Sequence, residues 1–395
     1  MKKKNETDKA AENNGRAVEP TSCGKPAGPG GSQDAKQGSD KELEELRKEI
    51  NSVDSALVDL LNRRAGLSLA VGEHKRQFPD SVVFHPGRES SLLQDIAGNS
   101  SGPLPEEHLR AIYREILSSS RSLQRPQRAA FLGPEGTFSH MAGRAFLGSQ
   151  VTFHAQPTLV EVFQSVENGD CDLGIVPLEN SLQGSVGQSF DLFMSHQVHI
   201  TAEKNLRIRQ SLLSRCHELS EIRVVYSHPQ PLAQCSGWLM RNLPKVPVLP
   251  LESTAASARR VVHEEGAAAI AHSDLASVLD LHLLAQGIED QPGNWTRFVL
   301  IGLKPADRPG ADKTSVLFSV ADKPGSLNRV LERFSQNRIN LRKLESRPMQ
   351  GESWKYVFFA DLECDIYDKS YAGVLEEVKE HCLYLRVLGC YPSHF

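Results

Sequence analysis

The sequence predicts a multidomain protein with an all-α domain, a larger α/β domain and a small α+β domain of the ferredoxin-like type. Three observations predict this class. The chain has 395 residues, which exceeds the typical domain of about 100 to 200 residues. Its apolar residues change from helical spacing to short strand-like runs near residue 126, and a linker-like segment rich in Lys, Asp, Pro and Gly occupies 304–313. We therefore expect a disordered tail at 1–40 and domains at 41–126, 128–303 and 313–391.

Composition and charge exclude several classes of protein. The formal net charge is −4, from 45 cations and 49 anions, so a nucleic-acid binder is not expected. No apolar run reaches the roughly 18 residues of a membrane span, and no apolar stretch follows the cationic start, as it would in a signal peptide. We expect a cytoplasmic protein. The seven cysteines include no C-x-x-C pair, which argues against a disulfide framework or a zinc site.

The first domain is predicted from helical periodicity. Residues 1–40 contain no Leu, Ile or Phe, so they cannot bury enough surface to offset the entropy of ordering. A helix is then expected from an N-cap at Asp40 to about Lys75, with shorter helices at 88–97 and 105–124. The apolar stripe of the first, long helix consists of Leu43, Leu46, Ile50, Val53, Leu57 and Leu60. A helix of roughly 45 to 50 Å needs partners for such a stripe, which suggests an intertwined helical dimer.

Strand-like runs dominate the middle of the chain. They occur at 128–132, 172–177, 197–201, 222–226, 246–249, 267–271 and 297–301. Helical stretches lie between several of them, which indicates a mainly parallel α/β arrangement in one or two lobes. Ligands of such folds bind at the carboxyl ends of the strands or between lobes.

The last domain has the order of a ferredoxin-like unit. We expect strands at 314–320, 340–347, 353–362 and 384–390, with helices at 326–337 and 368–381. This βαββαβ order contains no titratable constellation that would support chemistry.

Two cations on the long helix are candidates for a binding site. Arg64 and Lys75 are eleven residues apart, about three helical turns, so they share one face. A solvated helix face is the ordinary interpretation of such a pair. Arg47 is nearer the N-terminus of the same helix, where it could reach a partner chain.

The segment 43–124 resembles the all-helical chorismate mutase family. The resemblance rests on LEELRKEINSVDSALVDLLNRR, VGEHK, RESSLL and EILSSSRSLQ. It implies that cations bind the two carboxylates of chorismate and that a Lys and a Gln hold its ether oxygen. The residues at the matching positions are Arg47, Arg64, Lys75, Arg88, Glu89, Ser120 and Gln124. In the family an acidic residue usually stands three positions before the Arg-Glu pair, whereas this chain has His85.

These residue types suit a pericyclic rearrangement. Such a reaction needs neither a nucleophile nor a proton transfer. The site must hold a dianion in its compact conformer and stabilise charge on the oxygen as the C–O bond opens, which lysine and arginine can do. Glu89 would orient the substrate hydroxyl or the lysine.

Several short polar strings stand at the ends of the strands in the middle domain. They are GPEGTFSH (133–140), VPLENSLQGSV (176–186), YSHPQPLAQC (226–235), ESTAASA (252–258) and NWTRF (294–298). Each alone is a plausible turn or cap. The first could hold an anion at a helix N-terminus, but it is neither a P-loop nor a dinucleotide-binding turn.

Together these strings resemble the prephenate dehydratase family, over about 128–303. The resemblance implies a two-lobed fold like that of periplasmic binding proteins, with the site in the cleft. Thr296 would be the acid for the departing hydroxyl, and Arg297 would bind a carboxylate or form a salt bridge that closes the lobes. Further residues implied at the site are Asn180, Ser227 and Gln234, which would line the cleft, and Thr137 and Ser139, which would lie near a substrate carboxylate.

The C-terminal segment resembles the ACT family of amino-acid sensors. PGSLNRVL (324–331) matches its glycine turn, and ESRP (345–348) matches a loop of phenylalanine-regulated dehydratases. The resemblance implies that phenylalanine binds between two such domains. The implied residues are Gly325, Ser326, Leu327, Glu345, Ser346, Arg347 and Pro348.

The sequence thus predicts a bifunctional enzyme of phenylalanine synthesis that needs no metal or cofactor and is inhibited by its end product. One alternative is a prephenate dehydratase whose helical domain only dimerises, which the departure at His85 keeps open. Another is a non-catalytic amino-acid sensor.

Overall fold

The computed structural model describes residues 32–78, 83–348 and 356–393. This part of the chain divides after Arg63 into two compact units. The first unit is formed by helix α1 (Ser32–Arg76) up to Arg63. The helix begins at Ser32, so the predicted N-cap at Asp40 is wrong, because extending an existing helix costs far less than nucleating one. Residues 1–31 of the predicted disordered tail lie outside the described residues.

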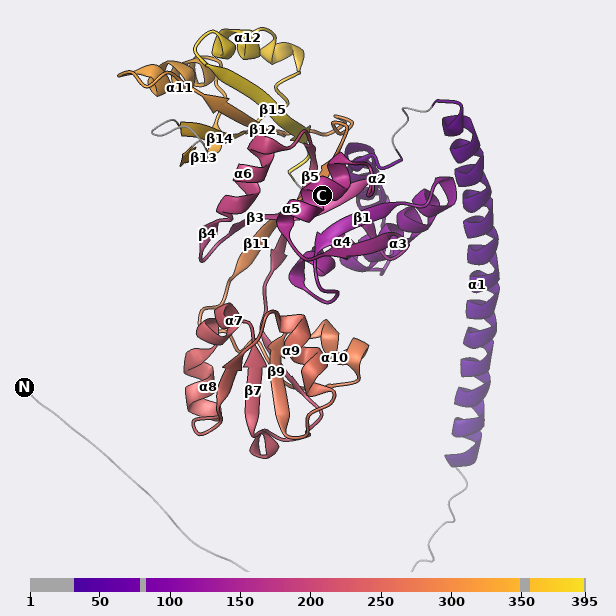
Figure 1. Ribbon diagram of the computed structural model, residues 1–395. Helices are drawn as coiled ribbons and strands as arrows, with labels where there is room; N and C mark the ends of the chain where they lie inside the picture. The colour runs from indigo at the N-terminus through magenta and orange to yellow at the C-terminus, as the bar shows by residue number, and fades with distance from the viewer. Residues whose placement is uncertain (1–31, 79–82, 349–355, 394–395) are drawn as a thin grey trace, which may run out of the picture. The chain divides into compact units, whose positions relative to one another are not determined.

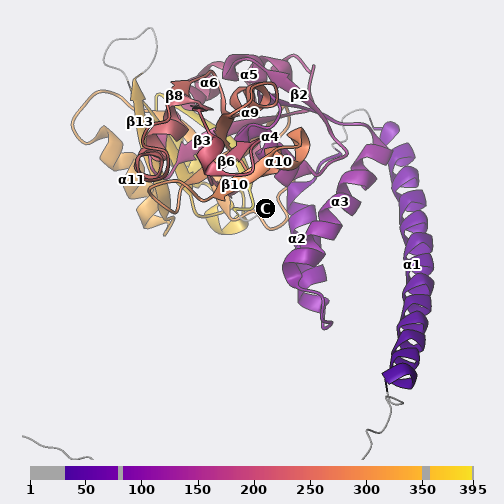
Figure 2. The same ribbon diagram turned by 90° about the horizontal axis from the view of Figure 1, so that it is seen from below.

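The second unit begins with three helical segments. The end of α1 is followed by α2 (Pro86–Asn99) and α3 (Glu106–Gln124), and α2 packs beside α3 (Figure 2). Gly72 lies where α1 meets the end of α3, because a Cβ at this position would be 2.8 Å from the Gln124 Cα. A glycine is therefore required for this close approach.

The first lobe of the α/β region is built on a mixed sheet in the order β2-β1-β3-β11-β5. Its strands are β1 (Arg128–Leu132), β2 (Thr152–Gln156), β3 (Leu173–Asn180), β5 (His199–Arg207) and β11 (Trp295–Gly302), and the short β4 (Gly184–Ser185) pairs with β3. Three helices accompany them: α4 (Phe138–Leu147), α5 (Leu159–Glu167) and α6 (Gly187–Ser195). Strands β1, β2 and β3 are parallel, whereas β11 runs antiparallel to β3 and β5.

The second lobe has a five-stranded sheet in the order β10-β6-β9-β7-β8. Its elements are β6 (Ser211–Ser214), β7 (Val224–Ser227), β8 (Val248–Pro250), β9 (Ala267–Ala271), β10 (His282–Gln286), α7 (Pro229–Gln234), α8 (Ser236–Asn242), α9 (Thr254–Val261) and α10 (Asp274–Leu279). Helices α7 and α8 cover one face of the sheet and α9 and α10 the other (Figure 1). Apolar side chains of β7 and β9 alternate between the two cores.

The chain passes between the lobes twice, after β5 and after β10. Because β11 returns from the second lobe into the middle of the first sheet, it runs against its neighbours. The predicted two-lobed α/β fold is therefore confirmed, but the mainly parallel sheet is wrong. The strands that the apolar pattern missed are β2, β4, β6 and β10, which are short or largely exposed.

The C-terminal domain has the predicted ferredoxin-like order. It consists of β12 (Lys313–Ser319), α11 (Ser326–Gln336), β13 (Leu341–Pro348), β14 (Tyr356–Leu362), α12 (Val374–Lys379) and β15 (Tyr384–Tyr391). The strands form an antiparallel sheet in the order β13-β14-β12-β15. Helix α12 is shorter than expected, because Gly373 adopts φ 90° and a separate 3₁₀ turn precedes it.

Within the described ranges, no helix combines the length and apolar character needed to cross a bilayer.

Candidate functional sites

A pocket rich in cations lies between the end of α1, α2 and α3. It brings together six of the seven residues predicted for the helical domain. They are Arg64, Lys75, Arg88, Glu89, Ser120 and Gln124. The seventh, Arg47, lies on the exposed surface of α1 in the first unit, and its role stays a prediction.

Short contacts hold the cations of this pocket in place. Arg64 Nη1 donates a hydrogen bond to Ser120 Oγ, which in turn donates to the Ile116 carbonyl oxygen (2.8 Å). Lys75 Nζ lies 3.2 Å from His85 Nε2. Burial and the neighbouring Arg88 lower the pKa of Lys75. Gln124 Oε1 is buried without a hydrogen-bond partner among the described residues, so a donor on a ligand would satisfy it.

Glu89 has a partner that the sequence did not reveal. Burial raises the pKa of its carboxyl, and the charge of Arg121 opposes that shift. The buried Arg121 pairs with Glu89, donates to the Leu147 carbonyl oxygen (2.5 Å) and lies over the Phe84 ring. A single arginine on a helix carries no sequence signal that separates it from a solvated one, which is why Arg121 was missed.

A second site lies in the cleft between the two lobes. It collects five of the predicted residues from both lobes, and they are Thr137, Ser139, Asn180, Gln234 and Thr296. Thr137 caps α4 and Ser253 caps α9, and both caps line the cleft. Two helix N-termini therefore face this space, and their backbone N–H groups favour an anionic ligand.

Thr296 is held by a network of amides. Asn180 Nδ2 donates to Thr296 Oγ1 (2.9 Å) and to Asn294 Oδ1 (2.7 Å). Asn180 Oδ1 accepts hydrogen bonds from the backbone N–H groups of Leu182 and Gln183. Since the Thr296 oxygen accepts from Asn180, its own hydrogen can be donated to a ligand.

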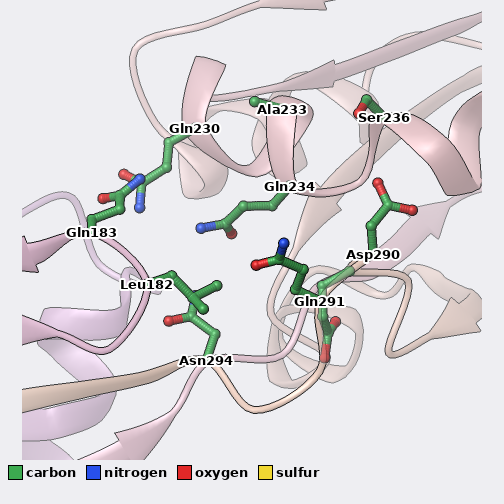
Figure 3. Close-up of a pocket in the computed structure, with 10 residues that line it drawn as sticks. Leu182, Gln183, Gln230, Ala233, Gln234, Ser236, Asp290, Gln291 and Asn294 are labelled. Carbon is green, nitrogen blue, oxygen red and sulfur yellow. The ribbon is translucent and has the colours of Figure 1, made fainter.

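The cleft continues into an adjoining pocket lined by side-chain amides and by the carboxylates of Glu289 and Asp290 (Figure 3). The two spaces share Gln230, Gln234 and Asn294. In Figure 3 the amide groups of Gln183, Gln230, Gln234 and Gln291 point into the pocket from opposite sides. No Lys or Arg is among the residues that line either space in the described part of the chain.

Arg297 does not line this cleft, so the geometry gives no support to its prediction as a substrate ligand. Neighbouring residues of a strand point to opposite faces, so Arg297 turns away from the cleft that Thr296 faces. Its guanidinium donates to Glu203 on β5, to Asp361 on β14 (2.5 Å) and to the Tyr391 hydroxyl (3.2 Å). Burial opposes its charge, but Tyr391, Asp361 and Glu203 together raise the pKa of Arg297. The arginine thus joins the first lobe to the C-terminal domain rather than one lobe to the other.

Ser227 is also misplaced by the prediction. Its side chain is fully buried and donates to the Ile270 carbonyl oxygen (2.6 Å). Ser227 is the last residue of β7, and this hydrogen bond connects β7 to β9. The residue therefore supports the fold of the second lobe. Its neighbour His228 lines the cleft instead.

The residues predicted for amino-acid sensing fall on two parts of the C-terminal domain. Gly325 adopts φ 80° at the start of α11, Ser326 is buried, and Leu327 packs against the core. The other four lie at the end of strand β13 and not in a loop. Ser346 and Pro348 are exposed, whereas Glu345 accepts from Ser185 (2.7 Å) and Arg347 pairs with Asp191 (3.1 Å) in the first lobe.

Family comparisons agree with the order of these three sites. A family model for chorismate mutase type II matches residues 46–125, one for prephenate dehydratase matches 129–306, and one for the ACT domain matches 314–379. The helical pocket and the interlobe cleft fall within the first two matches. The domain boundaries stay a prediction.

Whole proteins named for the first two of these families together are similar to the chain. The chain is 40% identical over 357 residues to a bifunctional chorismate mutase/prephenate dehydratase of Aquifex aeolicus, covering 89% of this chain and 98% of that protein. It is 38% identical to the protein of that description from Stutzerimonas stutzeri, over 89% of this chain and 98% of that protein. The chain belongs to the family of bifunctional chorismate mutase/prephenate dehydratases.

A solved structure shares part of the fold. The prephenate dehydratase of Arthrobacter aurescens, solved in complex with L-Phe, aligns with a TM-score of 0.61 and 32% identity, covering 67% of this chain and 90% of that chain.

No group of three or more His, Cys, Asp or Glu side chains in the described ranges is placed to hold a metal ion. The His196 ring contacts Glu167 (2.6 Å).

Proposed function

We propose that the helical pocket rearranges chorismate to prephenate and that the interlobe cleft converts prephenate to phenylpyruvate, each through the residues that line it. The observation that carries this proposal is the gathering of the predicted groups into two separate spaces of one chain. The first space is rich in cations. The second contains hydroxyls, amides and helix N-termini.

In the helical pocket, Arg64 and Arg88 bind the two carboxylates of the substrate. Lys75 Nζ and Gln124 Nε2 donate hydrogen bonds to the ether oxygen, whose negative charge grows as its bond to carbon breaks. Fixed charges in a partly buried site stabilise that change without reorganisation. The pocket also holds the side chain of the substrate over the substrate ring. This orientation lowers the entropic part of the activation barrier, because the reaction is intramolecular.

In the cleft, the reaction expels the ring carboxyl as CO2 and the ring hydroxyl as hydroxide, which takes up a proton from solvent to become water, and it leaves an aromatic ring. Thr296 donates its hydrogen bond to the departing oxygen, while Asn180 fixes the orientation of the threonine hydroxyl. The start of α4, at Thr137 and Ser139, receives a substrate carboxylate. Threonine is a poor acid in water, but a positioned hydrogen bond suffices where aromatisation drives the reaction.

Phenylalanine regulates the cleft through the C-terminal domain. Its site is formed by the turn at Gly325 and by β13, whose residues Glu345 and Arg347 touch the first lobe. A ligand that prefers one arrangement of these contacts shifts the equilibrium of the cleft. Replacing Arg347 with Ala is expected to weaken inhibition and leave uninhibited turnover largely intact, whereas equal loss of both would show a purely structural role.

Two copies of the chain pair through α1. The apolar stripe of this helix, Leu43, Leu46, Ile50, Val53, Leu57 and Leu60, is 47–62% exposed. Burial of such a stripe against a second copy would stabilise the helix, and Arg47 of one copy would then complete the pocket of the other. A location in the cytoplasm stays a prediction from the sequence.

One incubation tests the proposal. The full chain is supplied with chorismate, and prephenate and phenylpyruvate are followed with and without phenylalanine. The proposal predicts both products in succession and less phenylpyruvate with phenylalanine. A parallel incubation supplies prephenate instead. If prephenate is consumed but chorismate is not, the helical domain merely dimerises; if neither compound is consumed, the chain is a sensor.

A further inference from the structure

The segment that connects β11 to β12 reaches the helical pocket. Asp307 in this linker accepts hydrogen bonds from the backbone N–H groups of Gly87 and Arg88, both at 3.3 Å. It thereby caps the N-terminus of α2, where a carboxylate is favourable. A Cβ on Gly87 would lie 2.2 Å from the Pro309 carbonyl oxygen, so only glycine allows the linker to come this close.

His85 stands between this carboxylate and the lysine of the pocket. Its Nδ1 is 3.6 Å from Asp307 Oδ2, and its Nε2 is 3.2 Å from Lys75 Nζ. A carboxylate beside Nδ1 favours the tautomer that carries its hydrogen there. Nε2 is then left as an acceptor for the ammonium group of Lys75.

We propose that Asp307 and His85 are positioning residues for the mutase reaction, which fix Lys75 for the ether oxygen of chorismate. The linker places the Asp307 carboxylate beside His85, the position at which the family usually has an acidic residue. The His85 imidazole contacts both Asp307 and Lys75, so the position of the carboxylate determines the position of the lysine. This inference rests on the proposed role of Lys75.

The charge of Asp307 also acts on Lys75 directly. Burial and Arg88 lower the pKa of Lys75, while Asp307 and then Glu89 raise it. The other charged groups of the pocket are Arg64 on α1 and Arg121 on α3. Removing only the charge of Asp307 therefore lowers the pKa of Lys75 further, so the ammonium form is lost at a lower pH.

The test compares Asp307→Asn with Asp312→Asn in the full chain. Asparagine keeps an acceptor oxygen for α2 but not the charge. Asp312 is a matched control, because it is another linker carboxylate and binds Ser393 rather than the helical pocket. For Asp307→Asn we expect mutase kcat to fall about tenfold, a loss like that seen when a residue that orients a metal ligand is replaced. The alkaline limb of its pH profile should move to lower pH, with dehydratase turnover of added prephenate unchanged.

A second variant separates positioning from simple capping. Adding His85→Asp to Asp307→Asn places a carboxylate near Lys75 again and should restore both kcat and the alkaline limb. If the single variant leaves kcat and the pH profile unchanged, or if activity falls with thermal stability and His85→Asp does not restore it, the inference is wrong. If Lys75→Ala itself leaves mutase activity intact, the proposed function fails instead.

Discussion

The helical pocket and the interlobe cleft are lined by different kinds of groups. The pocket is lined by Arg64, Lys75 and Arg88. The cleft is lined by the amides of Asn180 and Gln234, the hydroxyl of Thr296, the N-termini of α4 and α9, and one carboxylate, Glu252. Point charges stabilise an oxygen that becomes negative within a rearranging molecule. Neutral donors can bind an anion and still release a product that has lost one of its carboxylates.

The comparison shows that cationic side chains in this chain have two different kinds of surroundings. In the helical pocket the cations face a ligand space. Beside the cleft, the buried Arg297 is used for structure and faces Glu203 and Asp361. The following predictions test this division, from the largest expected effect to the smallest.

Arg297→Ala should have the largest effect, on stability. It leaves Glu203 and Asp361 buried with one cation fewer, and breaking a buried ion pair costs about 3 to 5 kcal/mol. Denaturant unfolding measures the loss. The control is Arg342→Ala, whose pair with Glu363 lies at the surface, so its loss should change the unfolding free energy far less. An unchanged unfolding free energy together with a raised KM for prephenate would return Arg297 to the substrate.

Lys75→Ala should reduce mutase kcat/KM about 100- to 1000-fold, as loss of a group that stabilises a developing oxyanion does elsewhere. Turnover of added prephenate should not change. Arg76→Ala removes the neighbouring, exposed cation of the same helix and should have little effect. Equal losses in the two variants would mean that only the overall charge of the helix matters.

Thr296→Val should reduce dehydratase kcat about 100-fold, the lower end of the range for a proton-donating group. Valine keeps the shape of the side chain and removes the hydroxyl. Thr296→Ser keeps the hydroxyl and should retain most activity. Wild-type kcat in the valine variant would exclude the threonine as the donor.

Ionic strength should change the kcat/KM of the two reactions to different extents, and by smaller factors than the substitutions above. Raising salt from about 0.05 M to about 0.5 M shortens the screening length, so mutase kcat/KM should fall a few-fold. Dehydratase kcat/KM should fall less, because no Lys or Arg lines its cleft in the described residues. Stopped-flow or initial-rate assays at constant pH measure both, and an equal decline would contradict the contrast.

The helical pocket was the part most accessible from sequence. Helical spacing puts Arg64 and Lys75 on one face, and the family pattern adds residues whose convergence follows from packing α2 and α3 beside the end of α1. The pairing of Glu89 with Arg121 could not be foreseen, because it depends on which face of α3 is buried. The contact of Asp307 with α2 joins segments about 220 residues apart and leaves no local pattern.

The interlobe site was harder for two reasons. Strand alternation turns Thr296 and Arg297 to opposite faces of β11, but the strand predicted at 297–301 begins after Thr296, so the rule could not be applied to this pair. The return of β11 into the first sheet follows from the two crossings between lobes. No apolar run signals such a crossing, so the mixed sheet was not predictable.

The most direct measurement of the central claim is a product time course with the full-length Thr296→Val variant supplied with chorismate. If one chain holds two independent sites, chorismate is consumed at the wild-type rate and prephenate accumulates, while phenylpyruvate forms about 100-fold more slowly. If chorismate consumption falls together with phenylpyruvate formation, or if phenylpyruvate forms at the wild-type rate, the assignment of the two chemistries to these two sites is contradicted.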